Sequence, residues 1–403
     1  MTLAREPLRM SDPDASAVRS ILAVVPALRS LARAGEALGL GSHELLHAGP
    51  PISDGADACA PIAHSAITAI LFERWADTVE SAGALLRTGA IRLRPAQDNH
   101  CVVPLADVLS PSMWVQEVGD LRSPASVAWS PLNGGIEHVL RVGILGKDVL
   151  THLRWINGPF ADALALALNE PIPLLGLADE GIAGGDDCHG RTGVATAALA
   201  SRLEHRWTGT EAVACREFLS RAPSFFLNVW MAASKCMLDA ARGVAASSAV
   251  VAAGGNGEEF GIQLASQPGT WFTTRAEPPA VQPGLIVTDA VPLGAIGDSA
   301  VVDLLGLGAM TTPAVDGDAR LQFADILTDA VAAPRSLLMA AHPGFPRVQP
   351  RMVITARRVL ESAQAPVVSL GVLDKTGKRG RLAGGFYRPP LDLFERAVRG
   401  AAI

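Results

Sequence analysis

The chain has 403 residues, of which 49% are hydrophobic and only 5% aromatic, and its formal net charge is −6. A chain of this length is too long to fold around one simple hydrophobic core, so we expect two or three domains whose interiors are built from small aliphatic side chains. The acidic balance, without a basic stripe interleaved with aromatics, argues against nucleic acid as a partner, and no apolar run reaches the roughly 20 residues of a membrane span.

The N-terminal part predicts helices and one short strand. Residues 1–15 are polar, and we expect a frayed end there. Apolar residues then recur close to a 3.6-residue period, which predicts helices over residues 16–39. A strand over residues 43–51 ends in a Gly-Pro-Pro turn with His47 at its edge. For His47, a role as catalytic base and a role as a capped loop histidine both stay open.

A helix pair over residues 61–89 and a strand over residues 91–95 follow. The next loop is polar and carries Asp98, Asn99 and His100 in succession. In a loop this polar, a solvated surface is the default interpretation of such a cluster.

The sequence of the middle of the chain, roughly residues 150–243, predicts helices only. It differs in this from both flanks, for which strands are predicted as well. An Asn-Gly-Gly turn that starts at Asn133 precedes it and leaves room for close approach of the backbone. The last helix of this stretch, residues 225–245, places Asn228 and Lys235 seven positions apart on one face. One polar side chain on an apolar helix is usually a satisfied core group, whereas two on one face favour a lined pocket.

The densest polar cluster lies within residues 180–198, whose sequence is EGIAGGDDCHGRTGVATAA. Asp186, Asp187, His189 and Arg191 fall within six positions, after a Gly-Gly turn and before a predicted helix. Backbone N–H groups at a helix start attract anions, so one interpretation is a piece of active site in which Asp186, Asp187 or His189 acts as acid, base or metal ligand. The other is a helix start capped by its aspartates.

The last third returns to strands. Residues 247–274 predict a strand, a glycine-rich turn and a strand, and the turn at Asn256 and Gly257 either cradles a phosphate or closes a hairpin. Asp298 and Ser299 stand at a predicted helix start, where the Asp298 carboxylate either caps the helix or faces a substrate or metal. No GxSxG elbow surrounds Ser299, so a serine hydrolase is not expected.

Further helices are predicted over residues 318–333 and 352–363, and a strand over residues 366–373. A basic, glycine-containing loop, residues 374–381, comes next, and an amphipathic helix ends the chain. The fold class we predict is α+β, a multidomain chain in which mixed α/β regions flank a central all-helical subdomain. The expected boundaries are 1–149, 150–243 and 244–403.

Five scattered cysteines form no CxxC pair, which is typical of reduced thiols in a cytoplasm and not of a structural zinc site. We therefore expect a cytoplasmic protein without a bound metal or other cofactor.

Blocks spread over nearly the whole chain after about residue 40 resemble one family. They include LLHAGPPI at 45–52, LNGGIEHVLRVG at 132–143, GDDCHGRT at 185–192, FFLNVWMAASKCMLDAA at 225–241, NGEEFGI at 256–262 and IGDSA at 296–300. The resemblance is to the YlbE-like family of bacterial proteins, whose genes typically accompany FdrA. It implies α/β regions at both ends with a helical subdomain between them.

The resemblance also implies a role as a subunit of an oxamate carbamoyltransferase. That enzyme exchanges oxalurate and phosphate with oxamate and carbamoyl phosphate, and it works with an FdrA-like subunit and a third protein in an oligomer. The expected ligands are a small amide or acid and phosphate or carbamoyl phosphate. The alternative is a non-catalytic structural subunit of such a complex, and a weaker third hypothesis is a metal-dependent amidohydrolase that uses Asp186, Asp187, His189 and Asp298.

Carbamoyl transfer needs donors around the phosphate and a polarised carbonyl, with a base near the attacking nitrogen. Guided by the family, we expect catalytic roles for Asp186, Asp187, His189 and His47. The expected substrate-binding residues are Asn133, Arg191, Asn228, Lys235, Asn256, Gly257, Asp298, Ser299 and Lys375.

The chain departs from its relatives in site-like loops. Ala96-Gln97 stands where relatives carry Cys-His, and Gly255 stands where they carry Arg before Asn-Gly. Residues 373–376, Leu-Asp-Lys-Thr, replace Ala-His-Lys-Glu, so that only Lys375 remains. A member that acts on another small amide or acid, within a biosynthetic pathway, is therefore a further interpretation.

Overall fold

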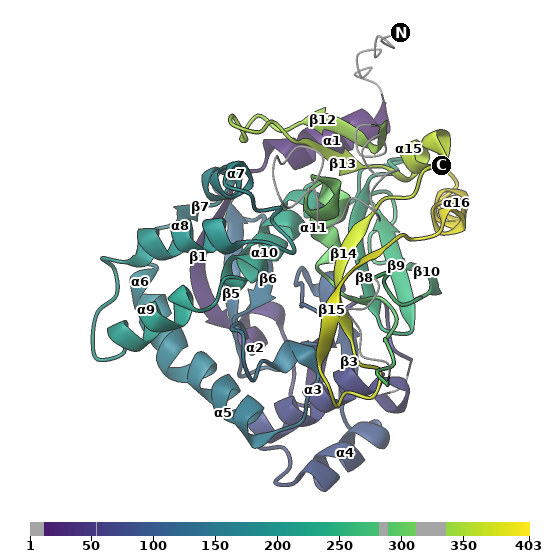
Figure 1. Cartoon of the computed structure of the whole chain (residues 1–403). Coiled ribbons are helices and arrows are strands. Elements are labelled where there is room, and N and C mark those ends of the chain that lie inside the picture. The colour runs from purple at the N-terminus through teal and green to yellow at the C-terminus, as the bar shows by residue number, and fades with distance from the viewer. Residues whose placement is uncertain (1–11, 54, 282–288, 312–335) are drawn as a thin grey trace.

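The computed structural model describes residues 12–53, 55–281, 289–311 and 336–403. Within these residues the strands form five small sheets of two to four strands each, with helices packed between and around them (Figure 1). The protein is therefore a mixed α/β structure. No helix in this part of the chain is both long enough and apolar enough to cross a membrane.

The first four-stranded sheet is antiparallel and has the order β6-β5-β1-β7. Its strands are β1 (Pro26–Arg33), β5 (Trp114–Asp120), β6 (Val127–Pro131) and β7 (Ile172–Pro173). Strand β1 corrects the prediction of helices alone over residues 16–39. Helix α1 (Pro13–Ala23) ends ahead of Pro26, which has no N–H to continue a helix, and α2 (Ala34–Leu38) follows β1.

Six of the α-helices that the structure describes follow one another in the middle of the chain. They are α5 (Lys147–Trp155), α6 (Ala161–Ala167), α7 (Leu175–Ala183), α8 (Gly193–Leu203), α9 (Ala212–Ser220) and α10 (Phe225–Asp239). Helix α10 is almost fully buried and packs on β1, β5 and β6. The stretch has no core of its own, because Phe160 and Trp230 join the same apolar cluster as Val18 and Leu28. A separate central subdomain is thus not visible.

The second sheet has the order β3-β2-β4, with β2 (Glu44–His47) parallel to β3 (Arg92–Pro95) and antiparallel to β4 (Val108–Leu109). A parallel pair needs a crossover connection, which α3 (Ala60–Phe72) and α4 (Val79–Arg87) supply. The two strands and the helix pair predicted for this region are confirmed.

The second four-stranded sheet, β10-β9-β8-β11, lies on the other side of the molecule (Figure 1). Its strands are β8 (Val250–Asn256), β9 (Glu259–Leu264), β10 (Phe272–Arg275) and β11 (Ile296–Gly297), and α16 (Leu391–Gly400) packs on β9 and β10. The strand, turn and strand predicted for residues 247–274 are confirmed, as is the amphipathic C-terminal helix.

Two hairpins complete the C-terminal region. β12 (Leu338–Ala341) pairs with β13 (Arg351–Ile354), so the helix predicted over residues 352–363 is reduced to α15 (Ala356–Ser362). The helix predicted over residues 318–333 lies outside the described residues. β14 (Val368–Leu373) pairs with β15 (Arg381–Tyr387), and this hairpin runs between the helices and the β8–β10 sheet (Figure 1, yellow).

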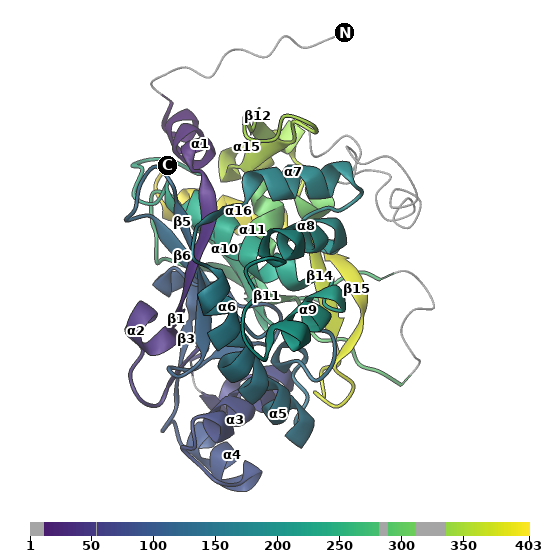
Figure 2. The same ribbon diagram turned by 90° about the vertical axis from the view of Figure 1, so that its left-hand side faces the viewer.

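The two ends of the chain are tied together. Helix α1 lies beside β12 and α15 in both views (Figures 1 and 2). The Asp14 carboxylate accepts hydrogen bonds from Ser247 Oγ (2.8 Å) and Ser248 Oγ (2.7 Å), and it lies 3.6 Å from Nη1 of Arg357. These contacts lock the N-terminal helix onto the C-terminal part of the fold.

Candidate anion-binding site

A cavity of about 280 Å³ lies where α10, the 187–191 loop and the β14–β15 hairpin meet. Its lining includes five of the residues predicted from sequence: Asp187, His189, Arg191, Asn228 and Ser299. Arg141 and Arg381 also line it, although neither residue was predicted for the site from the sequence.

The 187–191 loop is built by Asp187. Its Oδ1 accepts hydrogen bonds from the backbone N–H of His189 (2.7 Å) and of Arg191 (2.9 Å), and the Asp187 and Cys188 N–H groups donate to the Arg191 carbonyl. Asp187 Oδ2 lies 3.5 Å from Nη2 of Arg191. One carboxylate therefore closes the loop and orients the side chains that the loop presents to the cavity.

His189 is held by a carboxylate from another part of the chain. Its Nδ1 lies 2.5 Å from Oδ2 of Asp303 in helix α11 (Ala300–Leu305). The other oxygen of Asp303 accepts from the N–H groups of Ala309 (2.8 Å) and Ser369 (3.1 Å). Burial opposes a charge on His189, but the Asp303 carboxylate outweighs it and raises the pKa of the imidazole. Because Nδ1 is engaged, Nε2 is the ring atom left for a ligand.

Two arginines bring further positive charge. Arg141 comes from the short helix η3 (Leu140–Val142), and its Nη2 donates to the Gly135 carbonyl at 2.7 Å. Burial lowers the pKa of Arg141 to about 10; the charge of Arg381 acts in the same direction and that of Asp107 against it. Arg381 opposes protonation of His189 as well. These cations therefore lie within one another's electric field, which is unfavourable unless an anion joins them.

This arrangement of positive groups suits a small anion whose oxygen atoms accept several hydrogen bonds. Guanidinium groups bind phosphate and carboxylate oxygens through charge-assisted hydrogen bonds, and a protonated imidazole adds a transferable proton. Asn228, whose Nδ2 donates to the Pro131 carbonyl (3.2 Å), and Ser299, next to the start of α11, add neutral polar groups to the wall.

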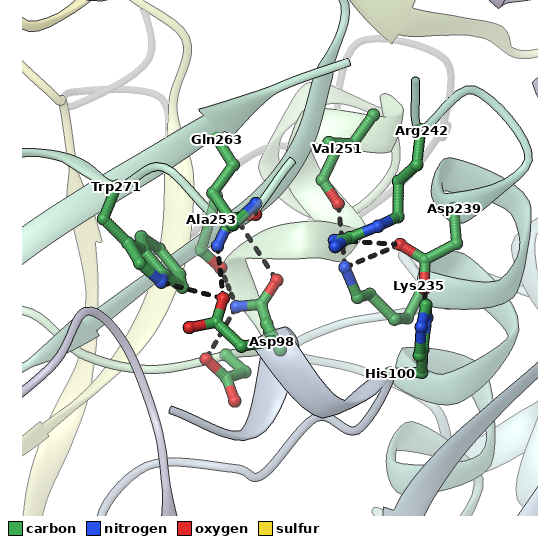
Figure 3. Close-up of polar contacts among 12 residues, drawn as sticks. Asp98, His100, Lys235, Asp239, Arg242, Val251, Ala253, Gln263 and Trp271 are labelled. Atoms are coloured by element: carbon green, nitrogen blue, oxygen red, sulfur yellow. Dashed lines mark hydrogen bonds and ion pairs between the residues drawn. The ribbon is translucent and has the colours of Figure 1, made fainter. Parts of the chain in front are cut away.

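Asp186 and Lys235 do not line the cavity. Both oxygens of Asp186 accept from the start of α8, at the N–H groups of Val194 (3.3 Å) and Ala195 (2.8 Å), so the capping interpretation describes this residue. Lys235 is wholly buried, and its Nζ contacts Asp239 Oδ1 (2.7 Å) and the Val251 carbonyl (3.1 Å), as Figure 3 shows.

Asp298 and the turn at Asn256 also serve the interior. The Asp298 carboxylate accepts from Gly49 N (2.9 Å), Gln97 Nε2 (2.7 Å) and Val103 N (3.0 Å), so it neither caps α11 nor faces the cavity. Asn256 Oδ1 accepts from the N–H groups of residues 258 and 259, and the Gly257 N–H donates to the carbonyl of residue 295. The hairpin interpretation of that turn therefore describes it, with no N–H group of residues 257–259 left for a phosphate.

Three further predicted residues lie outside the cavity lining. His47 is fully buried, its Nδ1 donates to the Ala48 carbonyl (2.8 Å), and burial lowers its pKa to about 4. Asn133 is buried between Asn157 and Asp107. Lys375 is exposed at the tip of the β14–β15 hairpin.

The loop at residues 98–100 corrects the expectation of a solvated surface. Asp98 Oδ1 accepts from Gln263 Nε2 (2.6 Å) and Trp271 Nε1 (3.1 Å), and His100 Nδ1 lies 2.8 Å from Asp239 Oδ2 (Figure 3). The loop thus joins β9 and α10, although the His100 ring itself stays half exposed.

The amidohydrolase hypothesis finds no metal-binding geometry. Among the described residues, no three His, Cys, Asp or Glu side chains are arranged to hold a metal ion. Asp186 and Asp298 are two of its four proposed ligands. Their carboxylate oxygens already accept hydrogen bonds from backbone and amide N–H groups.

Comparisons with known proteins place these residues in context. The sequence profile described as "Oxamate carbamoyltransferase subunit AllG" matches residues 91–299. The chain is 30% identical over 379 residues to the Oxamate carbamoyltransferase subunit AllG of Escherichia coli (strain K12), with 89% of each protein covered. It is 27% identical over 380 residues to the Uncharacterized protein YahG of the same organism, with 90% of this chain and 79% of that protein covered.

A solved structure shares the fold. The crystal structure of a conserved protein of unknown function from Enterococcus faecalis V583 has a TM-score of 0.87 to this one and covers 97% of both chains, at 24% sequence identity. The resemblance first seen in separate sequence blocks is confirmed over most of the chain. The profile includes Arg141 and the 187–191 loop, whereas Asp303 and Arg381 lie beyond its last residue.

Proposed function

The chain belongs to the AllG family of oxamate carbamoyltransferase subunits, and from this premise we propose that it carries a site for carbamoyl or acyl transfer. The site is the cavity between α10, the 187–191 loop and the β14–β15 hairpin. One observation supports this assignment above the others: Arg141, the 187–191 loop with His189 and Arg191, and Arg381 come from three separate segments and line the same cavity.

In the proposed reaction a phosphate oxygen attacks the carbamoyl carbon of a ureido acid. The bond from that carbon to the departing amide nitrogen breaks, and the nitrogen takes up one proton. His189, kept protonated by Asp303, gives that proton from Nε2, and the proton that the attacking hydrogen phosphate loses restores the charged imidazole. The products are carbamoyl phosphate and the free amide of the acid, oxamate when the ureido acid is oxalurate.

The arginines supply binding and charge stabilisation. Arg141 and Arg381 hold the oxygens of phosphate and of the substrate carboxylate, and Arg191, fixed by Asp187, completes the ring of positive charge. Donors fixed before the reaction stabilise charge that develops on the carbonyl oxygen without reorganising. Asn228 and Ser299 orient the neutral amide part of the substrate.

We further propose that the chain acts in a complex. The AllG relative is named as a subunit, and the resemblance described above implies an FdrA-like subunit and a third protein as partners. Activity should be measured on the complex obtained when this chain is co-expressed with the FdrA-like protein encoded by a neighbouring gene.

The test is an assay of carbamoyl phosphate formed from phosphate and a panel of ureido and acyl substrates that includes oxalurate. The complex that contains His189→Gln should lose turnover about 100-fold or more, the lower bound typical of a general acid, and Arg381→Ala should raise KM for phosphate. The matched control is Arg275→Ala, which removes an exposed arginine from β10 and should change neither parameter. Full activity of His189→Gln would remove this residue from the mechanism.

A second candidate is the non-catalytic structural subunit. It is favoured by Gln97 and Gly255, which stand where relatives carry a Cys-His pair and an arginine. Gln97 bonds Asp298 and the Ala253 backbone, and a Cβ atom at Gly255 would lie 2.1 Å from the Ala295 carbonyl oxygen. These positions therefore serve packing in this chain. Turnover by the complex that disappears with His189→Gln, while assembly is unchanged, would exclude this candidate.

A further inference from the structure

Asp107 is a buried carboxylate next to the proposed site, with no assigned role. The N–H of the preceding residue, Ala106, donates to the Arg141 carbonyl at 3.0 Å, so the two segments are neighbours. The side chain of Asp107 is wholly inaccessible. Among the described residues its carboxylate is bonded by the Val108 N–H and the Asn133 amide, and it forms no direct ion pair with Arg141.

A chain of buried amides fixes the orientation of this carboxylate. Asn157 Oδ1 accepts from the Trp114 N–H (2.7 Å), and Asn157 Nδ2 donates to Asn133 Oδ1 (2.9 Å). Asn133 must therefore present its Nδ2 to Asp107 Oδ1, at 3.3 Å. The Val108 N–H donates to the same oxygen at 2.9 Å. Both donors address Oδ1, and a proton on this carboxyl group belongs on Oδ2.

Asp107 Oδ2 differs from the oxygens of Asp298 and Asp303, two other fully buried aspartates. Within the described residues it has no hydrogen-bond partner, whereas Asp298 and Asp303 have donors on both oxygens. A buried ionised oxygen without a donor is unfavourable, and replacement by a neutral residue of similar size would remove that cost. A residue that contributed only to packing would not be expected to be a buried aspartate with one unbonded oxygen.

The charge that faces Asp107 is Arg141, whose guanidinium lines the cavity. The attraction is mutual: Asp107 favours the charged form of Arg141, and Arg141 favours the ionised form of Asp107. An anion in the cavity competes with Asp107 for the same guanidinium. Resting on the proposed function, we infer that Asp107 is a positioning residue behind Arg141 whose ionisation weakens the hold of the site on its anion.

Two ionisable neighbours of Asp107 keep their charge between pH 6 and 8. Burial raises the pKa of Cys101 well above its ordinary value and lowers that of His47 to about 4, so both stay neutral. Burial also raises the pKa of Asp107 to about 7. Two histidines contribute a pH dependence of their own: His189 across the cavity, whose pKa Asp303 raises against burial, and His152, whose pKa is lowered by burial and by the charge of Arg141. The experiment therefore removes His189 and compares variants that all keep His152.

The experiment measures sulfate affinity of the full chain by calorimetry at pH 6 and pH 8, because sulfate keeps its charge over this range. The background is His189→Gln, which removes the titrating imidazole. We expect this His189→Gln parent to bind sulfate roughly fivefold more weakly at pH 8 than at pH 6, which is the part of a coupling of about one pKa unit that is expressed in this range. Adding Asp107→Asn should abolish that difference and give the tighter value at both pH values. Asp162→Asn, the same charge change on the exposed face of α6, should leave the difference in place.

Equal pH dependence with and without Asp107→Asn would overturn the inference and leave the anion site standing. Absence of sulfate binding at either pH would instead refute the anion site, and the inference with it. If Asp107→Asn does not fold, Arg141→Gln in the same background decides. If Asp107 acts through Arg141, the sulfate affinity of the Arg141→Gln variant should no longer depend on pH. A pH dependence that persists in this variant would exclude an effect of Asp107 through Arg141.

Discussion

Nδ1 of His189 lies 2.5 Å from Oδ2 of Asp303, although 114 positions separate the two residues in the chain. Asp303 sits in the apolar helix α11 and has donors on both oxygens, so its carboxylate cannot turn away from the ring. The pair has the form of an imidazole oriented by a buried carboxylate, an arrangement that fixes the tautomer and favours the charged ring.

Asp303→Asn should lower the pKa of His189, because it removes the charge that outweighs burial of the ring. The protonated imidazole would then persist only to a lower pH, and the descending limb of the pH–rate profile should move to lower pH. Turnover of the complex should fall about 100-fold near neutrality. NMR titration of the His189 ring and the pH–rate profile measure the two effects. An unmoved ring titration would contradict the proposed pairing.

Gly308→Ala should disrupt the same pair through sterics. Gly308 has a φ of +60°, and a Cβ there would lie 2.4 Å from Asp303 Oδ1 and 3.0 Å from His189 Cβ. We expect a loss of about 1–3 kcal/mol of unfolding free energy, together with a fall in turnover. The control is Gly176→Ala in α7, where no atom lies within 4 Å of the added methyl group. That change should raise stability by about 0.5–1 kcal/mol, as chemical denaturation will measure.

Lys235→Met should destabilise the protein without abolishing anion binding. It removes a wholly buried cation from Asp239 and leaves that carboxylate with His100 and Arg242 (Figure 3). Breaking a buried pair on one side costs about 3–5 kcal/mol, and the remaining partners place the expected loss near 3. Arg399→Met, which breaks an exposed pair on α16, should change the unfolding free energy little. Loss of sulfate binding by folded Lys235→Met would restore the substrate-binding role predicted from sequence.

His47→Asn should reduce the sensitivity of the fold to acid. The pKa of His47 is about 4 in the folded protein and near 6.5 when unfolded, so the unfolded chain binds the extra proton in between. Stability contributed by the neutral ring is therefore complete above pH 6.5 and falls as the pH drops toward 4, by about 3 kcal/mol in all. The Asn variant keeps a donor for the Ala48 carbonyl and should lose less stability between pH 7.5 and 5. His205→Asn, on an exposed ring, should follow the parent protein.

Local pattern was enough to predict many of the elements. The crossover helices between β2 and β3, the β8–β9 hairpin and the C-terminal helix each carry a period or a turn signal of their own. The pattern of strand β1 was misleading, because its apolar residues at 27, 28 and 31 also fit a helical period. Only Pro26 indicated that the preceding helix ends there. Pairing with β5, across more than 80 residues, decided the outcome.

The candidate site was predicted in part, for a related reason. Residues 187, 189 and 191 cluster in sequence and stay together in space, so their polar density was visible. Arg141, Asp303 and Arg381 come from separate segments, and nothing local marks them as neighbours. A lone carboxylate in the apolar run of α11 was the one available signal for Asp303, since a buried charge needs partners. Lys235 misled because helical spacing gives the face of a residue but not what covers that face.

The carboxylate of Asp298 has a consequence for how the protein is made. It binds N–H donors at residues 49, 97 and 103, which leave the ribosome 195 to 249 positions earlier. At about 5–20 residues per second, Gly49 waits roughly 10–50 s for its acceptor. A nascent chain stopped short of residue 298 would hold those donors unpaired beside an unfinished core. Pairing of these N-terminal loop groups is thus coupled to synthesis of the C-terminal part of the chain, and chaperones have that interval in which to engage the emerging chain.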